Sequence, residues 1–137
     1  MQFVTGGAFQ GKRQWVKSQI ETYTWINGYE DELTFVQPLT STVVLEGCEH
    51  LIRRFVQEEG AEAVFKWQEV VQFYEAWERE DDGRNVIFIG CEIGSGIVPI
   101  EAENRLWRDV VGWCYQHTAK KCTIVTTIWS GIAKQLK

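Results

Sequence analysis

Two short segments of this chain consist almost entirely of apolar and β-branched residues, and each of them ends in glycine. They are TVVLEG at residues 42–47 and NVIFIG at residues 85–90. Strands that are apolar on both faces are typical of parallel sheets whose two sides are covered by helices. The sequence therefore predicts an α/β fold with a mostly parallel central sheet and helices on both faces.

Further elements are predicted around these two strands. Two more strands are expected at residues 2–5 and 122–128. Apolar residues recur at helical spacing in four other segments, which are residues 13–20, 48–57, 64–77 and 101–118. Between residues 22 and 41 the pattern is less clear, and we interpret residues 23–26 and 33–36 as short strands that would form a hairpin at the sheet edge.

The helical patterns also assign some side chains to the core. Trp67 and Trp77 fall on an apolar stripe and are expected to pack inside, rather than to form a flat platform for a cofactor. The helix at residues 101–118 should bury Leu106, Val110, His117 and either Trp113 or Cys114. The spacing assigns no place to Trp25 or Trp129. His50 follows Glu46 by one helical turn, so a role in a site is open to it.

The composition suits one domain that spans residues 1–137, with 45% hydrophobic and 24% charged residues. A net charge of −5 argues against general binding of nucleic acid, which depends on many basic contacts to phosphates. We find neither an apolar run of about 20 residues, as a membrane helix needs, nor a secretory signal, so we expect a cytoplasmic protein. Four cysteines without a C-x-x-C pair indicate neither zinc nor a redox dithiol, and we expect them to be reduced and mostly buried.

The opening segment FVTGGAFQGKRQW, residues 3–15, fits the phosphate-binding pattern G-x-x-x-x-G-K between a strand and a helix. In such a loop, glycines let backbone N–H groups turn toward phosphate oxygens, and the lysine reaches the terminal phosphates. A glycine-rich turn with a surface lysine would give the same pattern without binding nucleotide. The expected nucleotide-binding residues are Gly6, Gly7, Ala8, Phe9, Gln10, Gly11, Lys12 and Arg13.

Arg13 stands where this pattern normally has serine or threonine. That hydroxyl ligates the Mg²⁺ that bridges the β- and γ-phosphates, and an arginine cannot ligate a cation. Arg13 could pair with phosphate directly, or it could point outward and leave the metal to water and carboxylates. The substitution therefore weakens the case for phosphoryl transfer more than the case for nucleotide binding.

Two acidic residues end predicted strands, where open α/β sheets bind their ligands. Glu46 could hold Mg²⁺ directly or through water, or it could act only as a favourable charge at the start of the following helix. Glu92 could orient or deprotonate a substrate hydroxyl, or it could form a salt bridge with Arg105 or Arg108.

The C-terminal part of the chain, GCEIGSGIVPIEAENRLWRDVVGWCYQ at residues 90–116 and WSGIAKQLK at residues 129–137, resembles the adenosylcobinamide kinase/adenosylcobinamide-phosphate guanylyltransferase family of cobalamin synthesis. The opening VTGGAFQGK and the segment VVLEGCEHLIRRF are similar to the phosphate loop and the central strand and helix of that family. The positions of the C-terminal part that fit the family pattern are Glu92, Gly94, Gly96, Ile97, Val98, Pro99, Arg105, Arg108, Asp109, Gly112, Gln116, Gly131, Leu136 and Lys137.

This resemblance implies a fold like that of P-loop nucleoside triphosphatases and a kinase that transfers the γ-phosphoryl group of ATP or GTP to the aminopropanol hydroxyl of adenosylcobinamide. Lys12 would hold the phosphates, and Glu46 would hold Mg²⁺. Glu92 would orient or deprotonate the acceptor hydroxyl. Arg105 and Arg108 would contact nucleotide or cobinamide phosphate, unless they are solvent-facing charges. The resemblance also implies a homo-oligomer, such as a trimer, with the active site between subunits.

The chain departs from the family pattern in its middle. The bifunctional members carry a histidine that is guanylylated, and this chain, which is also shorter, has no histidine between residues 20 and 42. His50 and His117 lie in other motifs, so the guanylyltransferase activity is expected to be absent. Two other functions stay open: a degenerate member that binds nucleotide or corrinoid as a partner or regulatory protein, and a small nucleoside triphosphatase with another substrate.

Overall fold

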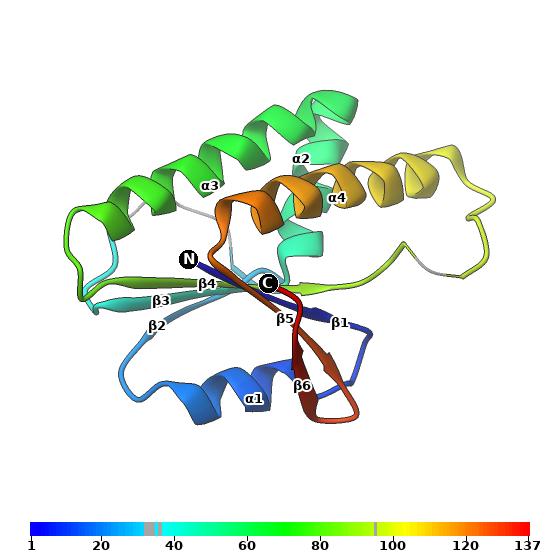
Figure 1. Cartoon of the computed structure of the whole chain (residues 1–137). Coiled ribbons are helices and arrows are strands. Elements are labelled where there is room, and N and C mark those ends of the chain that lie inside the picture. The colour runs from blue at the N-terminus through cyan, green and yellow to red at the C-terminus, as the bar shows by residue number, and fades with distance from the viewer. Residues whose placement is uncertain (32–34, 36, 95) are drawn as a thin grey trace.

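One sheet forms the centre of the molecule (Figure 1). The computed structural model describes residues 1–31, 35, 37–94 and 96–137, and in this part of the chain six strands lie in the order β2-β3-β4-β1-β5-β6. The first five strands are parallel, and β6 runs antiparallel to β5. Their bounds are β1 (Gln2–Gly6), β2 (Thr24–Asn27), β3 (Thr42–Glu46), β4 (Asn85–Cys91), β5 (Ile124–Trp129) and β6 (Ile132–Gln135).

Helices cover both faces of the sheet (Figure 1). The short helix α1 (Lys12–Gln19) lies on one face, and three longer helices lie on the other. These are α2 (Cys48–Glu59), α3 (Ala63–Arg79) and α4 (Ala102–Lys121), with a single 3₁₀ turn (Gly60–Glu62) between α2 and α3. The predicted α/β fold with a mostly parallel sheet is thus confirmed.

The continuous apolar strands are explained by a separate core on each side of the sheet. In β3, Val43 and Leu45 belong to the large core under α2, α3 and α4, whereas Val44 belongs to the small core under α1. Successive side chains of a strand point to opposite faces, so a strand between two cores must be apolar at every position. Trp67 and Trp77 are buried in the large core, as predicted.

Several details of the prediction change. The strand predicted at residues 23–26 is observed as β2, which pairs with β3 in parallel. Of residues 33–36 only Phe35 is described, and it lies outside any strand, so the predicted hairpin falls outside the described residues. In α4, Cys114 is buried and Trp113 is exposed, while Leu106 and His117 are half-buried. The strand β6 was not predicted. Among the described residues, no helix is long and apolar enough to cross a membrane.

Candidate active site

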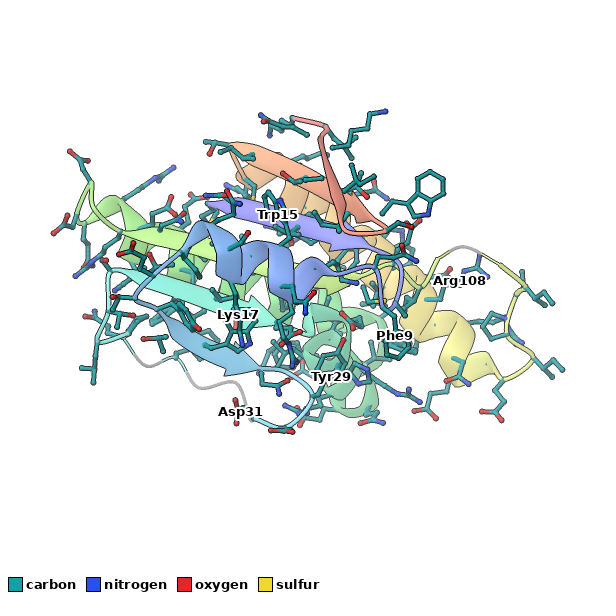
Figure 2. The ribbon with its side chains drawn as sticks, turned by 90° about the horizontal axis from the view of Figure 1, so that it is seen from below. Phe9, Trp15, Lys17, Tyr29, Asp31 and Arg108 are labelled. Atoms are coloured by element: carbon teal, nitrogen blue, oxygen red, sulfur yellow. The ribbon has the colours of Figure 1, made fainter. Side chains whose placement is uncertain are left out.

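A cavity of about 670 Å³ lies where the carboxyl ends of β1, β3 and β4 meet. One wall is formed by the loop after β1 and the first turn of α1, and the other by residues of the β2 end, α2, β4 and α4. Figure 2 shows Phe9 and Tyr29, one from each wall, at the same end of the molecule. The predicted phosphate loop therefore faces a cavity whose opposite wall comes from later parts of the chain.

The loop after β1 has the backbone that the glycine pattern predicts. Gly6 has φ of 147°, and a Cβ atom there would lie 2.4 Å from the carbonyl oxygen of Ile128. The amide N–H groups of Ala8, Phe9 and Gly11 line the cavity region and donate no hydrogen bond to another described residue. Ala8 and Phe9 are exposed, so their amides are open to solvent or to an anion at the start of α1.

Lys12 and the turn after β5 complete this wall. The Nζ atom of Lys12 donates to the carbonyl oxygen of Gly7 at 2.6 Å, which folds the side chain back over the loop. On the outside, the amides of Ser130 and Gly131 donate to the Gln10 side chain and carbonyl at 2.6 and 2.8 Å. The turn between β5 and β6 therefore holds the loop in place.

Arg13 and Glu46, which the sequence assigned to the same site, are paired. The Arg13 Nε atom donates to both carboxylate oxygens of Glu46 at 2.9 and 3.1 Å, and Nη2 donates to Oε2 at 2.8 Å. The Trp25 indole donates to the same Oε2 at 3.0 Å, which gives this tryptophan a place that spacing alone did not assign. The hydrogen bond and charge of Glu46 raise the pKa of Arg13, so the guanidinium stays charged.

This arrangement does not fit a magnesium ion bound by Glu46. Both oxygens of its carboxylate accept hydrogen bonds from nitrogen donors, and a guanidinium stands where a metal-binding hydroxyl is expected. Within the described ranges, histidine, cysteine and carboxylate side chains form no cluster of three that could hold a metal ion.

Glu49, which the sequence analysis did not select, lies on the floor of the cavity and is 2% exposed. Its carboxylate accepts hydrogen bonds from the Tyr29 hydroxyl at 2.6 Å, the Cys91 amide at 2.9 Å and the Tyr115 hydroxyl at 3.3 Å. Burial, together with Glu49, raises the pKa of both tyrosines, so their hydroxyls remain protonated donors. A carboxylate in the first turn of a helix usually suggests a solvated cap, and only its place after a buried strand could have indicated this role.

Aromatic side chains line the far wall of the cavity. The ring centroids of Tyr29 and His50 lie 4.5 Å apart, and those of His50 and Trp107 lie 6.1 Å apart. The Trp107 indole donates to the carbonyl oxygen of Glu49 at 2.9 Å, and the Arg53 guanidinium lies 4.5 Å from the Trp107 ring. The cavity thus has a polar wall at the loop and a largely aromatic wall opposite, and His50 belongs to the latter.

Five predicted site residues do not line this cavity: Gly6, Gly7, Glu92, Arg105 and Arg108. Glu92 is exposed, although its amide donates to the carbonyl oxygen of Gly6 at 2.9 Å and so ties β4 to the loop. Arg105 donates to the carbonyl oxygens of Pro99, at 3.1 Å, and Ile100. Arg108, which lies beside the segment before α4 in Figure 2, donates to those of Ile97, at 3.4 Å, and Gly94. Both arginines hold the segment that precedes α4, and the catalytic role of Glu92 stays a prediction.

Comparison with known proteins identifies the family. The family model described as cobinamide kinase / cobinamide phosphate guanyltransferase matches residues 21–136, which include β2 to β6 and the helices α2, α3 and α4. The match begins after the phosphate loop and α1. No curated protein matches the chain. Because the family model covers most of the chain, this protein belongs to the cobinamide kinase / cobinamide phosphate guanyltransferase family.

Proposed function

We propose that this protein is a kinase of cobalamin biosynthesis or salvage that transfers the γ-phosphoryl group of ATP or GTP to the aminopropanol hydroxyl of adenosylcobinamide. Membership of the family supports the pathway and the two substrates. The observation that carries the kinase proposal is the loop itself, since Lys12 lines the cavity together with Ala8, Phe9 and Gly11, whose amides donate to no described residue.

In the proposed reaction, the acceptor hydroxyl oxygen forms a bond to the γ-phosphorus while the bond to the β–γ bridging oxygen breaks. The nucleoside diphosphate leaves, and the hydroxyl proton passes to a base or to water. Phosphoryl transfer depends mainly on positioning and on neutralising the phosphate charge. Lys12, Arg13 and the loop amides supply positive charge and donors for the triphosphate, and we assign no step to magnesium because Glu46 is already paired.

The guanylyltransferase activity of the family is proposed to be absent. That activity requires the histidine of the family pattern, and the chain has none between residues 20 and 42. A second candidate function is nucleotide binding without turnover, in a partner or regulatory protein. The pairing of Arg13 with Glu46 favours it, because the metal position of an efficient kinase is filled by a guanidinium.

The test combines product detection with nucleotide affinity. The purified protein is incubated with adenosylcobinamide and ATP or GTP, and phosphorylated cobinamide is measured by mass spectrometry. We expect Lys12→Ala to lower kcat/KM by about a hundredfold, the typical cost of losing a charge-stabilising donor. Lys120→Ala is the matched control, because Lys120 is an exposed lysine in the last turn of α4, and this variant should keep the wild-type rate.

Three outcomes separate the candidates. Product formation that depends on Lys12 supports the kinase. Nucleotide binding without product supports the regulatory function. Nucleotide hydrolysis at a rate that adenosylcobinamide does not change supports a triphosphatase with another substrate. If neither ATP nor GTP binds, the proposal is wrong.

A further inference from the structure

Arg13 holds a fixed orientation because its carboxylate partner is itself held. Glu46 ends β3, which lies between β2 and β4 in the sheet, and only 10% of its side chain is exposed. The Trp25 indole, on the neighbouring strand β2, donates to it at 3.0 Å. Arg13 therefore contacts a rigid group on the sheet rather than a mobile surface carboxylate.

The pairing leaves part of the guanidinium free for a ligand. An arginine carries five N–H donors, and the contacts with Glu46 use the one on Nε and one on Nη2. The Nη1 amino group donates no hydrogen bond to any residue that the structure describes, and the Arg13 side chain is 50% exposed. Arg13 also lines the cavity beside Lys12, so its remaining donors lie at the wall where phosphates are proposed to bind.

A divalent cation normally performs two tasks at this position. It bridges the β- and γ-phosphates, and it neutralises their negative charge. A strand-end carboxylate and a loop hydroxyl hold the cation in place. A guanidinium braced by a carboxylate offers a fixed positive charge in the same place. Its planar fork also matches two phosphate oxygens at once, which a lysine ammonium does not.

We propose that Arg13, braced by Glu46 and Trp25, takes the place of the divalent cation, so that the site binds the nucleoside triphosphate in its metal-free form. This inference rests on the proposed nucleotide site. It predicts that added magnesium does not tighten binding, because the ion would meet the guanidinium at the position that it needs.

The first test compares nucleotide affinity with and without metal. Isothermal titration calorimetry is run with ATP and with GTP, once in EDTA and once in excess MgCl₂, at equal ionic strength because salt screens phosphate contacts. We expect affinity in EDTA to be at least equal to that in MgCl₂, within about threefold. Binding that requires MgCl₂ overturns this inference and leaves the proposed function standing, whereas no binding in either buffer overturns both.

The second test exchanges the cation for the expected hydroxyl. Arg13→Ser should weaken binding in EDTA by about tenfold or more, the effect of losing about 1.4 kcal/mol, and magnesium should restore part of the affinity. Arg79→Ser is the matched control, because Arg79 is an exposed arginine on α3 whose only ion pair is with Glu75, among the described residues. Circular dichroism checks that both variants fold. Arg13→Ser with unchanged affinity in EDTA overturns the inference.

Discussion

The hydroxyl of Tyr29 joins the end of β2 to the buried carboxylate of Glu49, at 2.6 Å. Tyr29→Phe would leave that oxygen without its shortest hydrogen bond in a site that is 2% exposed. Loss of a hydrogen bond to a buried charged group costs about 1.5–3 kcal/mol. We therefore expect urea denaturation to show a lower midpoint for Tyr29→Phe, with the same slope. The control is Tyr23→Phe, because the Tyr23 hydroxyl bonds to no described residue, and its urea midpoint should equal that of wild type. Equal midpoints for the two variants would contradict the role of Tyr29.

Cys91 is the residue through which occupancy of the cavity can be measured chemically. It is half-buried and lines the cavity, whereas Cys48, Cys114 and Cys122 are buried. Burial raises the pKa of Cys91 above its ordinary value, although Lys12 opposes this, so little thiolate exists at neutral pH. Alkylation should therefore accelerate as the solution is made more alkaline. Peptide mapping after iodoacetamide should find Cys91 modified first, and ATP should slow the reaction. Equal labelling of the buried thiols, or no effect of nucleotide, would refute this assignment.

Single residues of the site differ in how far the sequence could predict them. The loop and Lys12 follow from a local pattern, because a glycine backbone and a helix start are fixed by neighbours in the chain. The buried role of Glu49 depends on Tyr29, Cys91 and Tyr115, which are far away in the sequence. Local spacing in the sequence does not indicate contacts between such distant residues. For the same reason, the pairing of Arg13 with Glu46 could not be predicted.

Among the elements, α4 contains a glycine that its packing does not require. Nothing lies within 4 Å of a Cβ atom built on Gly112, and alanine is better than glycine inside a helix by about 1 kcal/mol. Gly112→Ala should therefore raise the stability by about that amount, measured by the urea midpoint. The opposite is expected of Gly90→Ala in β4, where the Cβ atom would lie 2.4 Å from the buried Tyr115 hydroxyl oxygen. Destabilisation by Gly112→Ala would contradict the open environment of that face.

The elements that the sequence predicted well are those whose burial leaves a pattern. The strands β1, β3, β4 and β5 start and end within about two residues of their predicted bounds, because the central strands are apolar for most of their length. β6 has four exposed residues, so no apolar pattern marks it. β2 is half-buried throughout. Its sequence therefore predicted a strand but did not indicate which strand it pairs with. The crossover through α1 makes β2 run in the same direction as β1, and so parallel to β3, which is a property of the topology.

At the scale of the whole molecule, the cavity combines parts that lie far apart in the chain. Its lining runs from Ala8 in the loop to Trp107 in α4, and it includes residues of α2 and β4. The parallel sheet brings these parts together, since the carboxyl ends of its strands share one edge. This explains why the family match, which begins at residue 21, and the phosphate loop before it converge on one site.

The same end of the molecule exposes apolar side chains that a single chain leaves uncovered. Ile97 and Ile100 are 96% and 93% exposed, on the segment that leads from β4 to α4 and extends beyond the sheet (Figure 1). Arg105 and Arg108 fix the backbone of this segment, so it presents these side chains from a held position. Exposed apolar groups next to one another mark interaction surfaces, and the resemblance to the family implies a homo-oligomer. We therefore expect a second copy of the chain to cover Ile97 and Ile100.

Sedimentation velocity over a range of concentrations measures this association. The double variant Ile97→Ser, Ile100→Ser should shift wild-type oligomers toward monomer, because two isoleucine side chains contribute about 1.5–3 kcal/mol each when buried. Leu39→Ser removes an equally exposed side chain, 101% exposed, from outside this segment and should leave the assembly intact. A wild-type protein that is monomeric at every concentration, or dissociation by Leu39→Ser as well, would exclude this segment as the contact. If the double variant also loses nucleotide affinity, the partner subunit contributes to the cavity that the segment borders.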